Sequence, residues 1–250
     1  MNEASGTLKE AIDKGRDAVA RARNIMAVTG AGVSAESGIA TFRDKDGLWQ
    51  KSDPEEYATP EAYARDPVKV WRWYDARRTG MAKAEPNPAH RALAELERQG
   101  KRVFIVTQNV DDLHEQAGSS EVVHIHGSIW HVRCERDGSV EENRETPLSE
   151  IPPRCACGNE MRPAVVWFGE QLPAAPVRQV QHHLLDVETD VCLVVGTEAS
   201  FGYILQWVHA ARQHGATVIT VNPRSTPLDG LSDLALQGRA GNILPQLVSD

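Results

Sequence analysis

Short apolar runs alternate with amphipathic stretches along most of this chain. Apolar residues recur at helical spacing over 8–23, which predicts an amphipathic helix, and the apolar run 25–28 then predicts a short buried strand. Strands alternating with helices predict an α/β fold with a doubly wound, Rossmann-like parallel sheet. Further strands are expected at 103–106, 122–125, 191–195 and 217–221, and further helices at 60–80, 89–99, 176–187, 203–214 and 242–248.

Residues 131–162 interrupt this alternation. They are polar, rich in Glu, Pro and Arg, and hold three of the four cysteines. We interpret this segment as a small inserted module with cysteines, and 44–88 as a helical insert, within one domain of residues 1–250. The Rossmann-like part is then expected to consist of 24–43, 89–130 and 163–250.

Composition narrows the possible functions. An apolar fraction of 41% and a charged fraction of 25% are typical of a globular protein. Lys and Arg total 27 against 35 for Asp and Glu, so the net charge of −8 disfavours tight non-specific binding to nucleic acid and is compatible with basic, lysine-bearing protein partners. The first 24 residues lack the pattern of a signal peptide, and apolar runs such as 191–195 are too short to cross a membrane, so a cytoplasmic location is expected.

A glycine-rich turn directly follows the first predicted strand. Residues 29–43 read TGAGVSAESGIATFR, in which Gly30, Gly32 and Ala35 match the G-x-G-x-x-G/A spacing of dinucleotide-binding turns. Glycine lets the backbone approach a pyrophosphate closely, although a purely structural tight turn has the same pattern. Glu55 and Glu56 lie about 20 residues on, in a Pro-flanked region with no preceding strand, so the ribose-binding acid of a dehydrogenase is missing. Hydride transfer is therefore disfavoured.

Five blocks in order resemble the sirtuin family, of the bacterial class III kind. They are GAGVSAESGIATFR from residue 30, TQNVDDLH at 107–114, HIHG at 124–127, VVWFGE at 165–170 and VGT at 195–197. The resemblance spans residues from about 30 to 245. It implies an enzyme that consumes NAD to remove acyl groups from lysine side chains, with release of nicotinamide and O-acyl-ADP-ribose.

The resemblance also implies where the chemistry occurs. The acyl oxygen attacks the ribose carbon, nicotinamide leaves, and a base then activates a ribose hydroxyl that attacks the imidate. By the resemblance the base corresponds to His126, the position just before Gly127, and histidine suits this task because it titrates near neutral pH. From the residues alone, His124 and His126 share one strand face and a metal pair is a competing interpretation.

Further positions match the cofactor-binding residues of the family. Gln108, Asn109 and Asp111 correspond to the nicotinamide and ribose site, and Asn109 also has a catalytic role by the resemblance; from the residues alone, an Asn-capped helix start is an alternative. Glu198 stands where the family usually has serine, which puts side-chain contacts at that turn in doubt. The remaining cofactor-binding candidates are Gly30, Ala31, Gly32, Ser34, Ala35, Glu36, Phe42, Arg43, Gly196, Thr197, Asn222 and Ala240.

Two regions correspond to substrate recognition. Residues 165–169 resemble the extended segment that pairs with the substrate peptide by strand addition, with Val166 and Phe168 along the lysine tunnel; an ordinary core strand is the alternative. Tyr74 and Arg77 share one face of a predicted helix and match the Tyr-x-x-Arg signature of sirtuins that remove acidic acyl groups. Arginine and a tyrosine hydroxyl suit the carboxylate of a succinyl or malonyl chain, so both desuccinylation and deacetylation are expected. Asn87, Pro88 and His90 follow in the family order.

The cysteines depart from the family pattern of two C-x-x-C pairs. Asp137 stands where a cysteine should follow Cys134, and Cys155 and Cys157 have one residue between them. These three thiolates with Asp137 or His131 could complete a structural zinc site, and a site that has lost its metal is the alternative. Cys192 lies in a predicted core strand and is expected to be a buried apolar residue.

Three other functions remain open at this point. A zinc-dependent amide hydrolase that uses His124, His126 and the cysteines would release free acid without NAD. A module that senses NAD or ADP-ribose without catalysis would have little need of His126 as a base. Mono-ADP-ribosyl transfer would consume NAD but attach the ribose to a protein.

Overall fold

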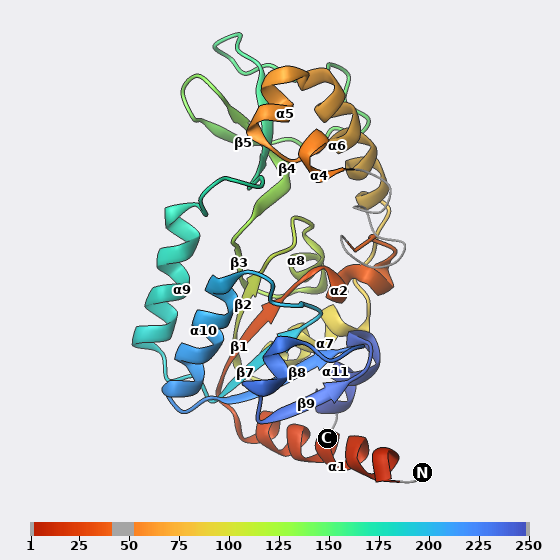
Figure 1. Cartoon of the computed structure of the whole chain (residues 1–250), viewed down its shortest axis with the longest axis vertical. Coiled ribbons are helices and arrows are strands. Elements are labelled where there is room, and N and C mark those ends of the chain that lie inside the picture. The colour runs from red at the N-terminus through yellow and green to blue at the C-terminus, as the bar shows by residue number, and fades with distance from the viewer. Residues whose placement is uncertain (1–2, 42–52, 249–250) are drawn as a thin grey trace.

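The computed structural model describes residues 3–41 and 53–248, and these form two units (Figure 1). The larger unit contains a six-stranded sheet of order β3-β2-β1-β7-β8-β9, in which all neighbouring strands are parallel. This confirms the predicted doubly wound α/β fold. The strands are β1 (Asn24–Thr29), β2 (Arg102–Thr107), β3 (Glu121–His124), β7 (Val191–Val195), β8 (Thr217–Asn222) and β9 (Leu234–Gln237).

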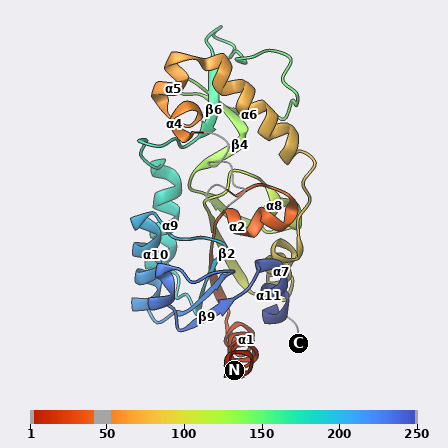
Figure 2. The same cartoon turned by 45° about the vertical axis from the view of Figure 1, so that its right-hand side comes forward.

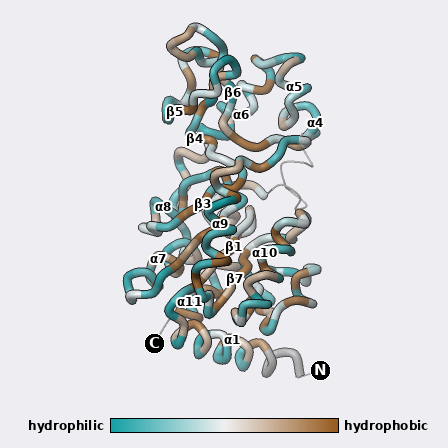
Figure 3. Tube along the Cα trace, turned by 90° about the vertical axis from the view of Figure 1, so that its left-hand side faces the viewer, coloured by the Kyte–Doolittle hydropathy of each residue, from teal (hydrophilic) through white to brown (hydrophobic). Residues whose placement is uncertain are grey.

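Helices cover both faces of this sheet, because the strands are apolar on both faces. In β1, Ile25 and Ala27 pack with helices α1, α7 and α11, whereas Met26 and Val28 pack with α9 and α10. Figure 2 shows α9 and α10 on one side of the sheet, α7 and α11 on the other and α1 below it, and Figure 3 shows hydrophobic residues along the strands between them. The helices are α1 (Glu3–Arg21), α7 (Pro88–Arg98), α9 (Ala174–Asp186), α10 (Gly202–Gln213) and α11 (Ala240–Val248).

The smaller unit combines two segments that are distant in sequence. An antiparallel sheet of order β5-β4-β6 packs against three helices, and Trp71, Val132 and Met161 belong to their common core. The predicted helical insert and the predicted module with cysteines therefore share one hydrophobic core. The elements are β4 (Gly127–Cys134), β5 (Val140–Glu142), β6 (Met161–Val165), α4 (Pro54–Tyr57), α5 (Pro60–Arg65) and α6 (Pro67–Met81).

Several boundaries differ from those predicted. The helix expected over 60–80 is two helices, because Asp66 accepts a hydrogen bond from the backbone N–H of Lys69 and caps α6, while Pro67 begins it. The segment expected to be extended at 165–169 lies after β6, which ends at Val165. Short elements that the pattern did not predict are α2 (Ala31–Ser34), α8 (Leu113–Ala117) and two 3₁₀ turns, η1 (Ala35–Ser37) and η2 (Pro227–Gly230). Within the described part of the chain, no helix is long and apolar enough to span a membrane.

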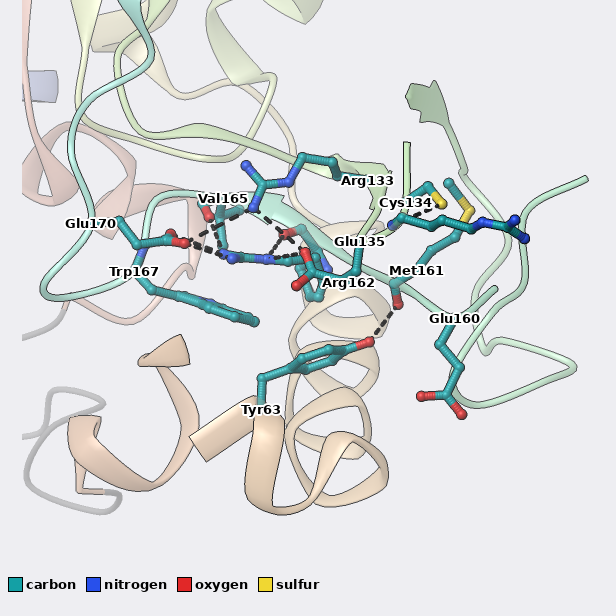
Figure 4. Close-up of polar contacts among 12 residues, drawn as sticks. Tyr63, Arg133, Cys134, Glu135, Glu160, Met161, Arg162, Val165, Trp167 and Glu170 are labelled. Atoms are coloured by element: carbon teal, nitrogen blue, oxygen red, sulfur yellow. Dashed lines mark hydrogen bonds and ion pairs between the residues drawn. The ribbon is translucent and has the colours of Figure 1, made fainter. Parts of the chain in front are cut away.

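A buried ion pair fixes the segment that follows β6. The guanidinium of Arg162, which is 2% exposed, donates to the two carboxylate oxygens of Glu170 at 2.6 and 2.9 Å and lies 3.2 Å from the ring centroid of Trp167. Glu170 also accepts the backbone N–H of Trp167 at 2.8 Å. Burial alone would raise the pKa of Glu170, but the hydrogen bonds from Arg162 and Trp167 hold that pKa below its ordinary value. Figure 4 shows the guanidinium between the carboxylates of Glu170 and Glu135.

We expect Glu170→Gln to lower the free energy of unfolding by about 3 kcal/mol, because it leaves the buried charge of Arg162 without its main counter-ion. Glu135→Gln is the matched control: its carboxylate is 3.9 Å from Arg162 and its side chain is 42% exposed, so a loss below about 0.5 kcal/mol is expected. Urea denaturation measures both. Equal losses would show that the Arg162–Glu170 pair does not hold this segment.

Candidate functional site

A cavity of about 850 Å³ lies at the carboxyl ends of the parallel strands and is lined by residues of both units. The sheet order places the chain reversal between β1 and β7, since β2 and β3 extend to one side of β1 and β7 to β9 to the other. Open α/β sheets bind their ligands at such a switch point. The lining includes 30–32, 108–110, 165–172, 196–201 and 222–227, together with Tyr74, Arg77, His126 and Tyr203.

Glycine is required where the turns after β1 and β7 meet. The N–H of Gly30 donates to the carbonyl of Val195 at 3.0 Å, and the N–H of Gly32 donates to the carbonyl of Gly196 at 2.9 Å. A Cβ on Gly30 would lie 2.7 Å from the Cβ of Thr197, and one on Gly32 would lie 2.8 Å from the Cα of Gly196. Gly196 also has φ of 63°. These glycines therefore allow the contact between the two strand ends, and a backbone approach to a ligand stays a prediction.

The loop after β2 provides amide side chains at this edge. The amide of Gln108 donates to the hydroxyl of Thr197 at 2.9 Å, and that of Asn109 donates to the hydroxyl of Ser34 at 2.9 Å. Asn109 does not cap α8, whose N-cap residue is Asp112. Asp111 is 4% exposed and accepts the backbone N–H of Leu113, and burial raises its pKa.

His126 lines the cavity, and both of its ring nitrogens are hydrogen-bonded. Nδ1 is 2.9 Å from the backbone carbonyl of Gln108, and Nε2 is 2.6 Å from the hydroxyl of Tyr203. A carbonyl only accepts, so Nδ1 carries the proton and Nε2 is the basic atom of the neutral ring. Burial lowers the pKa of His126, which keeps the ring neutral near pH 7.

His124 has a different environment. Its Nδ1 is 3.0 Å from the carbonyl of Asn109 and its Nε2 is 2.6 Å from the carboxylate of Glu115. Among the described residues, the one cluster of three side chains that could hold a metal consists of Cys134, Cys155 and Cys157, without a histidine. The geometry therefore gives no support to a catalytic metal held by His124 and His126.

Tyr74 and Arg77 both lie on α6 and line the same cavity as His126. The hydroxyl of Tyr74 accepts from the indole N–H of Trp167 at 3.0 Å, so its own proton remains available to a ligand. The guanidinium of Arg77 lies 4.6 Å from the ring centroid of Trp73 and 5.6 Å from that of Tyr74. Burial raises the pKa of Tyr74 and lowers that of Arg77.

The segment after β6 forms the opposite wall. The backbone N–H groups of Val166 and Phe168 donate to the carbonyls of His126 and Ala58, each at 2.9 Å. Both side chains line the cavity, and Phe168 is 41% exposed at its edge. These two N–H groups already donate within the protein. A peptide strand beside Val166 and Phe168 would therefore have to donate its own N–H groups to the backbone carbonyls of this segment.

Some predicted cofactor-binding residues do not line the cavity. Glu36 accepts the backbone N–H of Gly241 at 2.7 Å, at the start of α11. Phe42 and Arg43 lie outside the described residues. The predicted residues that line it are Gly30, Ala31, Gly32, Gln108, Asn109, Gly196, Thr197 and Asn222, and those that do not are Ser34, Ala35, Glu36, Asp111 and Ala240.

Asn222 lines the cavity and has a buried polar atom without a partner in the described part of the chain. The side-chain amide nitrogen of Asn222 is buried and has no hydrogen-bond partner among the described residues, which suits a position that a ligand completes.

Sequence analysis missed Tyr203 and its neighbour Phe201. The aromatic pair directly after the VGTEAS turn is a signal in the sequence, but the contact with His126 depends on how α10 packs.

The thiols of Cys134, Cys155 and Cys157 lie within 4.8 Å of one another and fit a zinc site with three cysteine ligands. His131 is not positioned as a fourth ligand, because Trp130, Val132 and Cys134 face the core of the small unit and His131 occupies the alternate face of β4. The carboxylate of Asp137 accepts from the N–H and hydroxyl of Ser139 at 2.9 and 2.6 Å.

Curated relatives align along nearly the whole chain. An NAD-dependent protein deacylase of Aquifex aeolicus is 46% identical over 90% of this chain and 93% of its own length. NAD-dependent protein deacylase 1 of Archaeoglobus fulgidus is 46% identical over 92% of this chain and 94% of its own length.

Solved structures show the same fold. A mutant Sir2 homologue in complex with ADP-ribose is 44% identical with a TM-score of 0.89, and covers 94% of each chain. A Sir2 homologue in complex with NAD is 45% identical with a TM-score of 0.86, and covers 94% of this chain and 92% of that chain. The Sir2 family model matches residues 30–201, which include the glycine turn, His126 and the cysteine cluster. This chain therefore belongs to the Sir2 family, the sirtuins.

Proposed function

We propose that this protein is an NAD-dependent protein-lysine deacylase that transfers the acyl group to ADP-ribose. The observation that carries the proposal is the position of His126, whose basic Nε2 lies in one cavity with the glycine turns on one side and the Val166–Phe168 wall on the other. Relatives named NAD-dependent protein deacylases, and the NAD and ADP-ribose complexes of Sir2 homologues, support it.

The residues have distinct roles in this reaction. Gly30, Gly32 and Gly196 let the backbone approach the pyrophosphate, and Asn109 orients the nicotinamide end. After the acyl oxygen has displaced nicotinamide, Nε2 of His126 takes the proton of a ribose hydroxyl, which then attacks the imidate carbon. The bond between the former imidate carbon and the lysine nitrogen then breaks, and water adds to that carbon, so that free lysine and O-acyl-ADP-ribose leave. The backbone carbonyl of Gln108 keeps Nδ1 protonated and thereby directs Nε2 to the substrate.

His126→Ala should reduce NAD-dependent deacylation by about 10²-fold or more, because a positioned general base contributes on that scale. Binding of ADP-ribose should persist, since the glycine turns remain. His182→Ala is the control, because the side chain of His182 is 76% exposed on α9. Mass spectrometry of the peptide measures activity and calorimetry measures binding. Equal activity in the two variants would remove His126 from the mechanism.

Acidic acyl-lysines are the proposed preferred substrates. Tyr74 and Arg77 line the cavity on the side of the small unit, where a guanidinium and a phenol O–H can bind a terminal carboxylate. Burial strengthens such a pair, because water screens it less. Acetyl-lysine is expected to react as well, since the NAD site and apolar wall are common to both substrates. A solved Sir2 structure bound to a myristoylated histone peptide supports an acylated peptide as the class of substrate.

Arg77→Met should lower kcat/KM for a succinyl-lysine peptide by about 10-fold or more, because it removes a charge-assisted hydrogen bond of about 1.5 to 3 kcal/mol. The rate with the matched acetyl-lysine peptide should change less than about 3-fold. Arg72→Met, on the exposed side of α6, should alter neither rate. Equal losses of both activities in Arg77→Met would mean that Arg77 does not recognise the acyl carboxylate.

Cys134, Cys155 and Cys157 are proposed to hold a structural zinc ion. The cluster lies in the small unit, whose β4 leads directly from His126 at its amino end, so zinc would stabilise the cavity wall without entering the reaction. Asp137 is the remaining candidate for the fourth ligand. The boundaries of the inserted segments and a cytoplasmic location stay predictions from the sequence.

Purified protein should contain about one zinc ion per chain. Cys155→Ser should lose most of the zinc and unfold at a lower temperature, because one of three thiolates is removed. Cys192→Ala is the control: its thiol is buried in β7, where burial raises the pKa to about 12, and zinc content should stay unchanged. If elemental analysis finds no zinc in the wild-type protein, the site has lost its metal.

A further inference from the structure

The basic nitrogen of His126, Nε2, already has a hydrogen-bond donor in this structure. Because Nδ1 donates to the carbonyl of Gln108, the neutral ring can only accept at Nε2. The hydroxyl of Tyr203 lies 2.6 Å from Nε2, so the phenol O–H is the donor. The lone pair that deacylation would use is thus occupied by a side chain of the protein itself.

Aromatic packing fixes this hydroxyl. The ring of Tyr203 stacks on Phe201 with centroids 5.4 Å apart and planes 9° apart, and it contacts Trp207 at 5.3 Å. Phe201 also meets the ring of His126 edge-on at 5.6 Å. Tyr203 is in the first turn of α10, directly after the turn that follows β7, and lines the cavity. The contact joins the two sides of the active cavity.

We propose that Tyr203 is a positioning residue for His126: its hydroxyl holds Nε2 as a hydrogen-bond acceptor before the cofactor binds, and a ribose hydroxyl then displaces it. The second half rests on the proposed function, in which Nε2 accepts the proton of that ribose hydroxyl. The two hydroxyls are chemically equivalent donors for one lone pair, so they cannot both occupy it. Displacement leaves a neutral, correctly oriented imidazole facing the substrate.

The phenol hydroxyl can donate to Nε2 of the neutral ring or accept from Nε2–H of the imidazolium, so the pKa of His126 depends on how strongly it pairs with each form. Other groups around His126 do not substitute for this contact. From the adjacent β3, His124 pairs with Glu115, and from the loop after β2 the contact is the carbonyl of Gln108. Across the cavity, Glu170 pairs with Arg162. The other charged residues that line the cavity are Arg77, Glu198 and Arg224. Loss of the phenol hydroxyl should therefore change the pKa of His126.

The test is an NMR titration of the histidine ring signals in unliganded wild type and Tyr203→Phe, with the His126 signal identified by its absence in His126→Ala. The variant keeps the ring stack and removes only the hydroxyl. We expect the pKa of His126 to change by about 0.5 to 1 pH unit, the equivalent of one neutral hydrogen bond. Tyr57→Phe, which removes a hydroxyl from α4, should leave the titration unchanged. An unchanged pKa in Tyr203→Phe would overturn the assignment.

The displacement is tested by repeating both titrations with saturating ADP-ribose. If the ribose hydroxyl replaces the phenol, the difference between wild type and Tyr203→Phe should disappear. A difference that persists at saturation would mean that Tyr203 stays on His126 and is not displaced. These titrations need no turnover, so they are separate from the proposed function, which fails if wild-type protein does not consume NAD with an acyl-lysine peptide.

Discussion

The close approach of the turns after β1 and β7 is the constraint on which the site depends. The N–H of Gly30 donates to the carbonyl of Val195, the last residue of β7, and the N–H of Gly32 donates to the carbonyl of Gly196. Atoms of residues 196 and 197 already fill the space that a side chain at either glycine would need. The contact lies where the sheet reverses its order, so the carboxyl ends of neighbouring strands diverge around it. Gln108, His126 and Asn222 line the cavity and follow or end strands on either side of this junction.

The small unit completes the cavity through polar contacts that reach into the larger unit. Asp112, next to the loop with Asn109, accepts from the indole of Trp130 at 2.9 Å and from Arg144 at 2.7 Å. On the other wall, the buried pair of Arg162 and Glu170 holds the backbone from Val165 to Trp167. Both connections begin in the unit that contains the cysteine cluster. The fold of that unit and the shape of the cavity are therefore physically linked.

The sequence predicts the strands that are buried on both faces and many of the residues that line the cavity at their carboxyl ends. Strands β1, β2, β7 and β8 are continuous apolar runs, and their spacing predicts the parallel sheet. Strand β9 has four residues, one of them buried, and too weak a pattern to detect. The face alternation of β4, which places His131 away from the cysteine cluster, follows from packing against helices distant in sequence. The contact between Tyr203 and His126 is likewise tertiary, since it depends on how α10 lies over the cavity.

In the proposed reaction, acyl removal is coupled to NAD cleavage. The most direct measurement is the mass of the small-molecule products after wild-type protein is incubated with a succinyl-lysine peptide, with and without NAD. The structure predicts nicotinamide and O-succinyl-ADP-ribose in equal amounts with the free-lysine peptide, and no reaction without NAD. Free succinate formed without NAD would contradict the account and indicate direct hydrolysis.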